Sequence, residues 1–276
     1  MTQPVRRPSA RVVVVNWRQA ELTIRAARSI REQLGGGDGL VVVDNASGDG
    51  SAERLRREGL TVVESSENRG FGAGVNLGAR GMVEDVLVLL NNDAVAEPGF
   101  LEALLAPLGD PPSAAAPAAT TARILLAGRW KPAAPGQQDA LVSPRTGRWT
   151  RLDEEAAARG EGEVLVNSTG NLVDASGNGY DRDWLVPAER EHSPSEVFGL
   201  CGGACAIRRE AWQALRGFRE DLFMYYEDTD LSWRLRERGW RVLYVREAVA
   251  RHDHASSSGT GSPMFIQVNV RNRILT

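Results

Sequence analysis

Two amides and a carboxylate, Asn91, Asn92 and Asp93, directly follow the apolar stretch DVLVLL (residues 85–90). Packing alone gives no reason to end a buried strand in this way. Hard divalent cations prefer oxygen ligands, and Mg²⁺ or Mn²⁺ usually binds through one or two carboxylates together with substrate phosphates. Asp93 is therefore a candidate ligand for Mg²⁺ or Mn²⁺. A helix cap is the alternative, because residues 97–98, Glu-Pro, can begin a helix.

A second acidic group, Glu227, Asp228 and Asp230, follows the aromatic residues of FMYY (223–226). Acids at a helix N-terminus interact favourably with the helix dipole, so a structural role is one interpretation. The other is catalytic, because an aromatic wall that includes Tyr226 forms a platform for a sugar. A carboxylate beside that platform can deprotonate an acceptor hydroxyl group.

His252 follows the apolar stretch AVA (248–250) and its neighbour Arg251. A single histidine more often has a structural role than a ligating one. Its place after an expected strand nevertheless allows His252 to complete a metal site with Asp93.

Asp44 ends the apolar stretch LVVVD (40–44) and begins DNASGDGS. A carboxylate there can accept hydrogen bonds from a nucleobase N–H or a ribose hydroxyl. The alternative is an Asx turn, with Ser47 or Asp49 capping the next helix, and both roles can hold together.

Three glycines, Gly70, Gly72 and Gly74, precede an expected helix in NRGFGAGVNLG (68–78). Such glycines let backbone N–H groups approach a phosphate. The stretch is not the dinucleotide-binding fingerprint, because it follows the third strand instead of the first.

The elements that must position these residues alternate clearly in the first third of the chain. Helical patterns, such as the one over residues 20–34, separate four short runs rich in branched apolar residues. This alternation predicts a doubly wound parallel sheet with right-handed crossovers, whose ligands lie beyond the carboxyl ends of the strands. The four runs are RVVVVNW (11–17), LVVVD (40–44), LTVVES (60–65) and DVLVLL (85–90), and three of them end in polar residues, Asn16, Asp44–Asn45 and Asn91–Asn92–Asp93, that we expect to converge on one crevice.

Regular patterns are interrupted between residues 128 and 195, which are rich in Gly, Pro, Trp and charged residues. We interpret 128–195 as a loop-rich insert that covers the crevice, within a single domain over 1–276. Residues 11–106 would form its nucleotide-binding half and 107–276 its acceptor-binding half. The last stretch is apolar and helical without an evident cap, so we expect a C-terminal continuation beyond Thr276.

The charge, the cysteine content and the apolar runs of the chain limit the classes of protein to which it can belong. The net charge of −3 and the pI of about 5.8 argue against a nucleic-acid-binding surface. Cys201 and Cys205 match neither a zinc site nor a disulfide framework, so we expect small buried strand residues in a cytoplasmic protein. No run approaches the ~20 apolar residues of a membrane span. Lys131 is the only lysine, and the arginines that replace lysine suit diphosphate recognition.

Seven stretches together resemble the family 2 glycosyltransferases of the GT-A fold, especially the bacterial rhamnosyltransferase-like branch. They run in the family's order over most of residues 11–273, and the insert at 128–195 is the least matched part. The stretches are VVVVNW, VVVDNASGDGS, NRGFGAGVNLG, VLVLLNNDAVAEPGFL, GLCGGACAIRREAW, GFREDLFMYYEDTDLSWRLRERGWRVLYV and RHDHASSSG with RNR.

The resemblance implies a role for individual residues. Asp228 would be the catalytic base, and Asp93 and His252 would hold Mg²⁺ or Mn²⁺ against the diphosphate. Asn91 replaces the first acid of the family's Asp-x-Asp motif, which implies a less charged metal site. Arg271 or Arg273 would cover the diphosphate. The donor nucleotide would contact Asn16, Asp44, Asn45, Asn68, Gly70, Gly72, Asn76 and Asn92, and the acceptor would contact Gly202, Gly203, Tyr226 and Glu227.

The activity implied is an inverting, metal-dependent transfer of a sugar from a UDP- or dTDP-sugar to a hydroxyl of a glycan or lipid-linked acceptor. It would take place in the cytoplasm at the inner face of the membrane, with peripheral membrane association. One alternative is a nucleotidyltransferase, which would need a basic glycine-rich loop where NWRQAE offers only Arg18. The other is an inactive nucleotide-sugar-binding module, which Asn91 favours and which Asp93, Asp228 and His252 together oppose.

Overall fold

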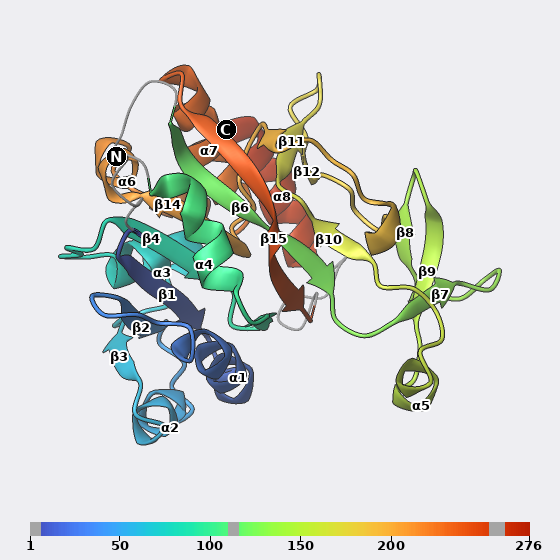
Figure 1. Cartoon of the computed structure of the whole chain (residues 1–276), viewed down its shortest axis with the longest axis horizontal. Coiled ribbons are helices and arrows are strands. Elements are labelled where there is room, and N and C mark those ends of the chain that lie inside the picture. The colour runs from blue at the N-terminus through green and yellow to red at the C-terminus, as the bar shows by residue number, and fades with distance from the viewer. Residues whose placement is uncertain (1–6, 110–115, 254–262) are drawn as a thin grey trace, which may run out of the picture.

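A computed structural model describes residues 7–109, 116–253 and 263–276 (Figure 1). Its first part alternates strands and helices as the sequence predicts. In order, the elements are β1 (Ala10–Asn16), α1 (Ala20–Arg31), β2 (Gly39–Asp44), α2 (Ser51–Arg57), β3 (Thr61–Glu64), α3 (Gly70–Gly78), β4 (Val86–Leu90), β5 (Ala94–Ala96), α4 (Phe100–Leu105) and the 3-10 helix η1 (Ala106–Leu108).

The second part adds two long strands, β6 and β15, several short ones and four further α-helices among the described residues. In order, the elements are β6 (Pro117–Leu126), β7 (Trp130–Pro132), β8 (Leu141–Ser143), β9 (Gly147–Arg151), α5 (Glu154–Ala158), β10 (Val166–Ser168), β11 (Asn171–Val173), β12 (Gly179–Asp181), η2 (Ala188–Arg190), β13 (Glu196–Val197), β14 (Ala204–Arg208), α6 (Arg209–Ala214), η3 (Glu220–Leu222), α7 (Glu227–Glu237), β15 (Arg241–His252) and α8 (Pro263–Leu275).

The central sheet has the strand order β13-β15-β6-β14-β4-β1-β2-β3. The pairs β3-β2, β2-β1 and β1-β4 are parallel, as predicted, whereas β14 lies antiparallel between β4 and β6. Because successive residues of a strand point to opposite faces, Val12 and Val14 enter one core layer and Val13 enters the other. Helices α1, α2 and α4 cover the first face, and α3, α6 and α7 cover the second. The predicted α/β fold with a sheet flanked by helices is confirmed.

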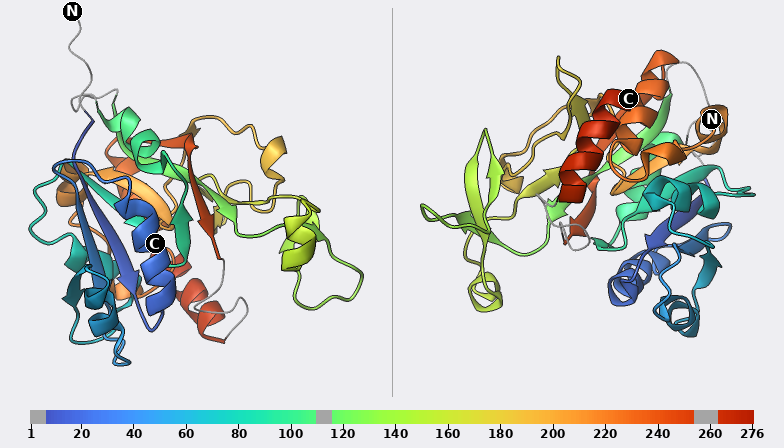
Figure 2. Two further views of the ribbon diagram at one scale, coloured as in Figure 1. Left: turned by 60° about the horizontal axis from the view of Figure 1, so that its bottom comes forward. Right: turned by 180° about the vertical axis from the view of Figure 1, so that it is seen from behind.

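The insert divides into two parts. Strands β7, β8 and β9 and helix α5 extend away from the central sheet (Figures 1 and 2) around a small apolar cluster that includes Trp130 and Trp149. The hairpin β11–β12 instead packs beside the N-terminus of α7, where the Asn171 amide donates to the Thr229 hydroxyl at 2.9 Å. Residues 128–195 thus contain short strands, and only their second part borders the crevice.

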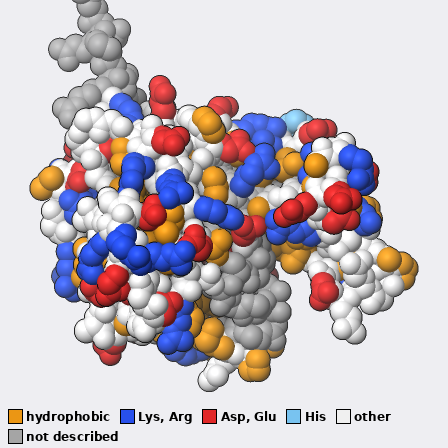
Figure 3. Space-filling model, turned by 90° about the horizontal axis from the view of Figure 1, so that it is seen from below, with side chains coloured by type: hydrophobic (Ala, Val, Ile, Leu, Met, Phe, Trp, Pro, Cys, Tyr) orange, Lys and Arg blue, Asp and Glu red, His pale blue; other side chains and the backbone are white. Residues whose placement is uncertain are grey.

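The surface carries both signs of charge. On the face shown in Figure 3, arginine side chains lie among acidic ones. This mixed face differs from the basic face that nucleic-acid binding requires. Among the residues that the structure describes, no helix is long and apolar enough to cross a membrane.

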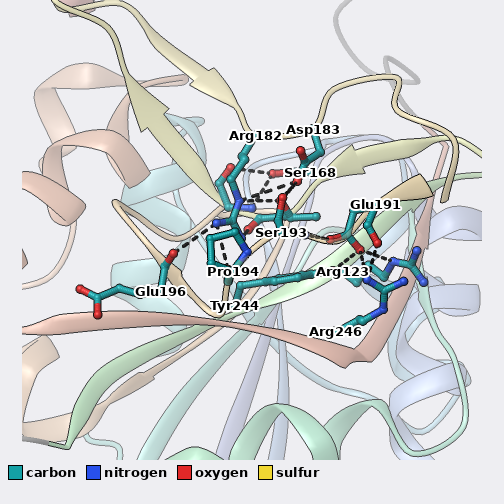
Figure 4. A network of polar contacts seen from close by, with 12 residues as sticks. Arg123, Ser168, Arg182, Asp183, Glu191, Ser193, Pro194, Glu196, Tyr244 and Arg246 are labelled. Atoms are coloured by element: carbon teal, nitrogen blue, oxygen red, sulfur yellow. Dashed lines mark hydrogen bonds and ion pairs between the residues drawn. The ribbon is translucent and has the colours of Figure 1, made fainter. Parts of the chain in front are cut away.

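A buried ionic network fastens the insert to the sheet (Figure 4). Glu191, which is only 1% exposed, accepts a hydrogen bond from the Tyr244 hydroxyl at 2.8 Å and pairs with Arg123 and Arg246 at 3.2 and 3.1 Å. The Arg182 guanidinium lies over the Tyr244 ring, 5.1 Å from its centroid. Burial, together with the neighbouring Glu191, raises the pKa of Tyr244. Because each buried charge has a partner, this network holds residues 182–196 against β6 and β15.

Candidate active site

A cavity of about 330 Å³ opens beyond the carboxyl end of β4, between the sheet, the hairpin β11–β12 and the N-terminus of α7. It brings Asp93, Asp228 and His252 together, although they are far apart along the chain. Polar side chains line it together with apolar ones such as Val15, Phe71 and Ile124. The lining also includes Asn91, Asn92, Asn167, Asn171, Tyr180, Asp181, Cys201, Gly202, Gly203, Tyr225, Tyr226, Glu227 and Asn269.

Asp93 and His252 meet through a strand pairing. The short strand β5, directly after Asp93, pairs with the end of β15 so that Ala94 lies opposite His252. The His252 Nε2 atom consequently lies 2.9 Å from the Asp93 Oδ1 atom. Because β5 separates Asp93 from α4, the helix-cap interpretation of Asp93 is wrong.

The other ring nitrogen of His252, Nδ1, lies 2.7 Å from the Asn167 Oδ1 atom. An amide oxygen only accepts hydrogen bonds, so Nδ1 is the donor in this contact and Nε2 is the nitrogen that faces Asp93. A distance of 2.9 Å between Nε2 and the Asp93 oxygen suits a hydrogen bond or a cation bound by both atoms.

The pair fits a divalent cation. Neighbouring ligands of an octahedral ion at ~2.1 Å are separated by about 3 Å, close to the 2.9 Å between the His252 and Asp93 atoms. No group of three His, Cys, Asp or Glu side chains that suits a metal occurs among the described residues. A pair of protein ligands is in keeping with Mg²⁺ or Mn²⁺, because these ions usually keep water and substrate phosphate as further ligands.

Asp228 is held by hydrogen bonds to both of its carboxylate oxygens. Its Oδ2 atom accepts from the Gly202 amide at 2.9 Å, and Oδ1 accepts from the Thr229 amide at 2.7 Å. Burial raises the pKa of Asp228, and these hydrogen bonds act in the opposite direction. The result is an oriented carboxylate, more basic than an ordinary aspartate, at the cavity wall. Such a group suits proton abstraction.

Two buried oxygen atoms at the cavity have no hydrogen-bond partner among the described residues. They are Oε2 of Glu227 and Oδ1 of Asn171, whose side chains are 8% and 7% exposed. Buried polar atoms are nearly always paired in folded proteins, so two unpaired acceptors in one cavity indicate a place for donors from a ligand. Sugar hydroxyl groups are donors of this kind.

Burial and the adjacent charge of Asp228 raise the pKa of Glu227. The unfolded chain releases this proton near pH 4.5, whereas the folded chain retains it to higher pH, so stability should fall as pH rises from there through the folded pKa. We expect Glu227→Gln to lack this loss, with a melting temperature that falls less between about pH 4 and pH 9. Calorimetry would test this, with Glu237→Gln, an exposed acid of the same helix, as control. Equal slopes in wild type and Glu227→Gln would contradict it.

The predicted nucleotide-binding strand ends do converge. The Asn16 amide donates to Asp44 Oδ2 at 2.7 Å, and the Thr23 hydroxyl joins Asn16 Oδ1 at 2.7 Å to the Asn92 amide at 3.4 Å. Of the eight predicted donor-binding residues, however, only Asn92 lines the cavity. Asp44 is 3% exposed and accepts from the Ser47 amide at 2.9 Å, which is the Asx-turn alternative. Its contact with a base stays a prediction.

The glycine-rich stretch serves close packing within the chain. Gly70 has a φ of +86°, and a Cβ added there would lie 1.8 Å from the Phe223 carbonyl oxygen. The Gly70 amide donates to Asn68 Oδ1 at 3.0 Å and the Phe71 amide to the Phe223 oxygen at 2.8 Å, so neither amide is free for a phosphate. The Asn45 amide reaches the Gly70 oxygen at 3.0 Å.

Further predicted residues lie outside the cavity. Gly72 packs against Phe218, 3.2 Å from the place a Cβ would occupy. Asn76 binds the backbone of Phe218 with both ends of its amide, at 2.9 and 3.0 Å. Arg271 and Arg273 bind Leu222 and Asn178.

Sequence reasoning missed Asp181, Asn167 and Asn269. Asp181 ends β12 and lines the cavity, and burial raises its pKa to about 6. It belongs to the insert, which lacks periodicity, so only the turn-rich composition of GNGYDRDW hinted at a hairpin there. The prediction that both cysteines lie in a strand holds for Cys205 alone, because Cys201 precedes β14 and lines the cavity.

Comparisons with known proteins agree with this architecture. A relative in Mycobacterium tuberculosis, an N-acetylglucosaminyl-diphospho-decaprenol L-rhamnosyltransferase, is 27% identical over 246 residues, covering 80% of this chain and 68% of the relative. The structure of mannosyltransferase PcManGT from Pyrobaculum calidifontis, in complex with GDP-Man and Mn²⁺, has a TM-score of 0.55 at 20% identity over 92% of this chain. That of GalNAc-T7 with UDP, GalNAc and Mn²⁺ has a TM-score of 0.60 at 16% identity over 96% of this chain.

This chain spans 59% of the mannosyltransferase chain and 48% of the GalNAc-T7 chain, and the likeness to both shows the GT-A fold. The model of the family described as "Glycosyltransferase like family 2" matches residues 7–273, nearly the whole chain. The protein is therefore a glycosyltransferase and belongs to this family.

Proposed function

We propose that this glycosyltransferase moves a sugar from a UDP- or dTDP-sugar to a hydroxyl group of a glycan or lipid-linked acceptor, with inversion at the anomeric carbon. The observation that carries the proposal is one cavity that holds an oriented basic carboxylate, Asp228, and a metal-competent pair, Asp93 and His252.

In this reaction, Asp228 takes the proton of the acceptor hydroxyl as its oxygen attacks the anomeric carbon. The bond from that carbon to the diphosphate breaks on the opposite face, so a single displacement inverts the configuration. Asp93 and His252 would hold Mg²⁺ or Mn²⁺, which offsets the negative charge that develops on the diphosphate. Glu227 and Asn171 offer oxygen atoms that can accept hydrogen bonds from sugar hydroxyl groups, and Tyr225 and Tyr226 form the aromatic wall.

The relative supports the acceptor class. Its name specifies L-rhamnosyl transfer to N-acetylglucosaminyl-diphospho-decaprenol, a lipid-linked glycan. We therefore propose rhamnose on dTDP as the first donor to test and a polyprenyl-diphosphate-linked sugar as the acceptor. An acceptor of this kind would place the protein at the cytoplasmic face of the membrane, in peripheral association.

A donor screen tests the proposal as a whole. UDP- and dTDP-sugars are incubated with the protein and a lipid-linked acceptor, with and without Mn²⁺, and the products are identified by mass spectrometry. We expect release of a nucleoside diphosphate together with an extended acceptor, in which NMR shows that the transferred sugar has the opposite anomeric configuration to that in the donor. Release of pyrophosphate would indicate a nucleotidyltransferase, and binding without any turnover would indicate an inactive nucleotide-sugar-binding module.

Asn167 should support the metal site through His252. Replacing it with leucine removes the acceptor that keeps the proton on Nδ1, so His252 loses its fixed orientation. Loss of such a partner typically weakens metal binding by about 10–100-fold. A Mn²⁺ titration of nucleotide binding would measure this, and an unchanged Mn²⁺ midpoint would contradict the assigned orientation of His252.

Asp181 should bind a hydroxyl group of a sugar in the cavity. A hydrogen bond to a charged group contributes about 1.5–3 kcal/mol, so Asp181→Asn should lower kcat/KM for transfer by about 10–100-fold. Asp139→Asn changes an exposed acid of the same insert and serves as control. Equal kcat/KM values for the wild type and Asp181→Asn would exclude this contact.

A further inference from the structure

The loop that carries the aromatic wall follows an unusual backbone path. Phe223, Tyr225 and Tyr226 have φ angles of 65°, 65° and 70°, in the left-handed region that residues with side chains rarely adopt. The Met224 amide donates to the Leu222 oxygen at 2.8 Å, which makes Phe223 the centre of a γ-turn of the rare class. Such a path persists only when surrounding contacts enforce it.

The contacts that enforce it come from α8. The Asn272 side chain is fully buried, and its Nδ2 atom donates toward the oxygens of Leu222, Met224 and Tyr225 at 2.9, 2.8 and 2.7 Å. Its Oδ1 atom accepts from the Arg271 guanidinium at 2.9 Å, which is consistent with the amide nitrogen facing the loop. Among the α8 side chains that the structure describes, Asn272 alone is buried.

The same loop is also held by α3. The Phe71 amide donates to the Phe223 oxygen at 2.8 Å, and a glycine at position 70 is required because a Cβ would collide with that oxygen. The loop then continues directly into Glu227 and Asp228 at the cavity. One turn before Asn272 on α8, Asn269 lines that cavity.

We propose that Asn272 is a positioning residue that holds the left-handed loop 222–226 and thereby sets the places of Tyr226 and Asp228 in the cavity. Three carbonyl oxygens converge on the Asn272 Nδ2 atom and share its two N–H groups, and the Arg271 guanidinium is a second donor to the Leu222 oxygen. The catalytic consequence rests on the proposed transfer reaction, whereas the mechanical role does not.

Two variants test the role. Asn272→Leu keeps a similar volume without donors, and Asn272→Ser keeps one donor in a smaller side chain. Hydrogen exchange followed by mass spectrometry measures how firmly the loop is held. The amides to follow are those of Phe71, Met224 and Asp230, which donate hydrogen bonds to loop oxygens. Gln267→Ala, on the exposed side of the same helix, is the matched control.

In Asn272→Leu we expect faster exchange at these amides only, unchanged nucleotide affinity, and a kcat lowered by about 10²-fold, the usual effect of a misplaced catalytic group. Asn272→Ser should lie between Asn272→Leu and the wild type. Equal exchange in all three proteins would overturn the proposal, as would faster exchange throughout the sheet, which marks general destabilisation. Faster hydrogen exchange in the loop together with a normal kcat would overturn the positioning role. A wild type that transfers no sugar would refute the proposed function, while the exchange pattern would still decide whether Asn272 holds the loop.

Discussion

Replacing Asp228 with asparagine is expected to lower the rate of sugar transfer by about 10²–10⁴-fold, the usual contribution of a general base. The amide has nearly the same shape, and its one oxygen can keep one of the two hydrogen bonds, from the Gly202 or the Thr229 amide, but it cannot take a proton from the acceptor. Nucleotide binding should therefore be kept. Steady-state transfer assays and calorimetric titration with the nucleoside diphosphate measure the two quantities separately.

The matched control is Glu237→Gln, which changes an exposed acid at the other end of the same helix. Its transfer rate should equal that of the wild type. The pH profile adds a second check, because the acid-side decline in the wild-type rate should be absent from the residual activity of Asp228→Asn. A variant with normal turnover would remove Asp228 from the mechanism.

Loss of the metal pair is expected to abolish the effect of Mn²⁺ on nucleotide binding. In Asp93→Ala the cation loses its carboxylate ligand, and in His252→Ala it loses the imidazole, which lies 2.9 Å from that carboxylate. If these two residues are the protein ligands, removal of either leaves a single one. We expect Mn²⁺ to tighten UDP or dTDP binding to the wild type and to leave the affinity of either variant unchanged.

Asp253→Asn provides the control for charge alone, because Asp253 is adjacent to His252 and pairs with Arg25 and Arg151. It should respond to Mn²⁺ as the wild type does. The proposed metal site would be rejected if Asp93→Ala retained the full Mn²⁺ response in calorimetric titration.

The local sequence predicts much of the fold and several of the residues that line the cavity. Runs such as VVVV (12–15) are apolar on both faces, and this pattern by itself specifies a strand between two helical layers. Asp93 and Asp228 stand out in the sequence because one follows a buried strand, where packing does not explain a carboxylate, and the other follows an aromatic run, and both line the cavity. These signals depend only on near neighbours in the chain.

Only the tertiary structure shows which residues far apart in the chain come into contact. The three residues of β5 have no pattern of their own, yet their pairing with β15 places His252 against Asp93. The sequence around Gly70 suggests a phosphate-binding loop, whereas in the structure Gly70 lies in close contact with Phe223. Asp181 reaches the cavity from an irregular insert, and Asn272 reaches the loop 222–226 from the last helix. Their contacts join segments that are far apart in the chain. Such contacts depend on how the insert and the last helix pack against the rest of the fold, and local periodicity does not encode that packing.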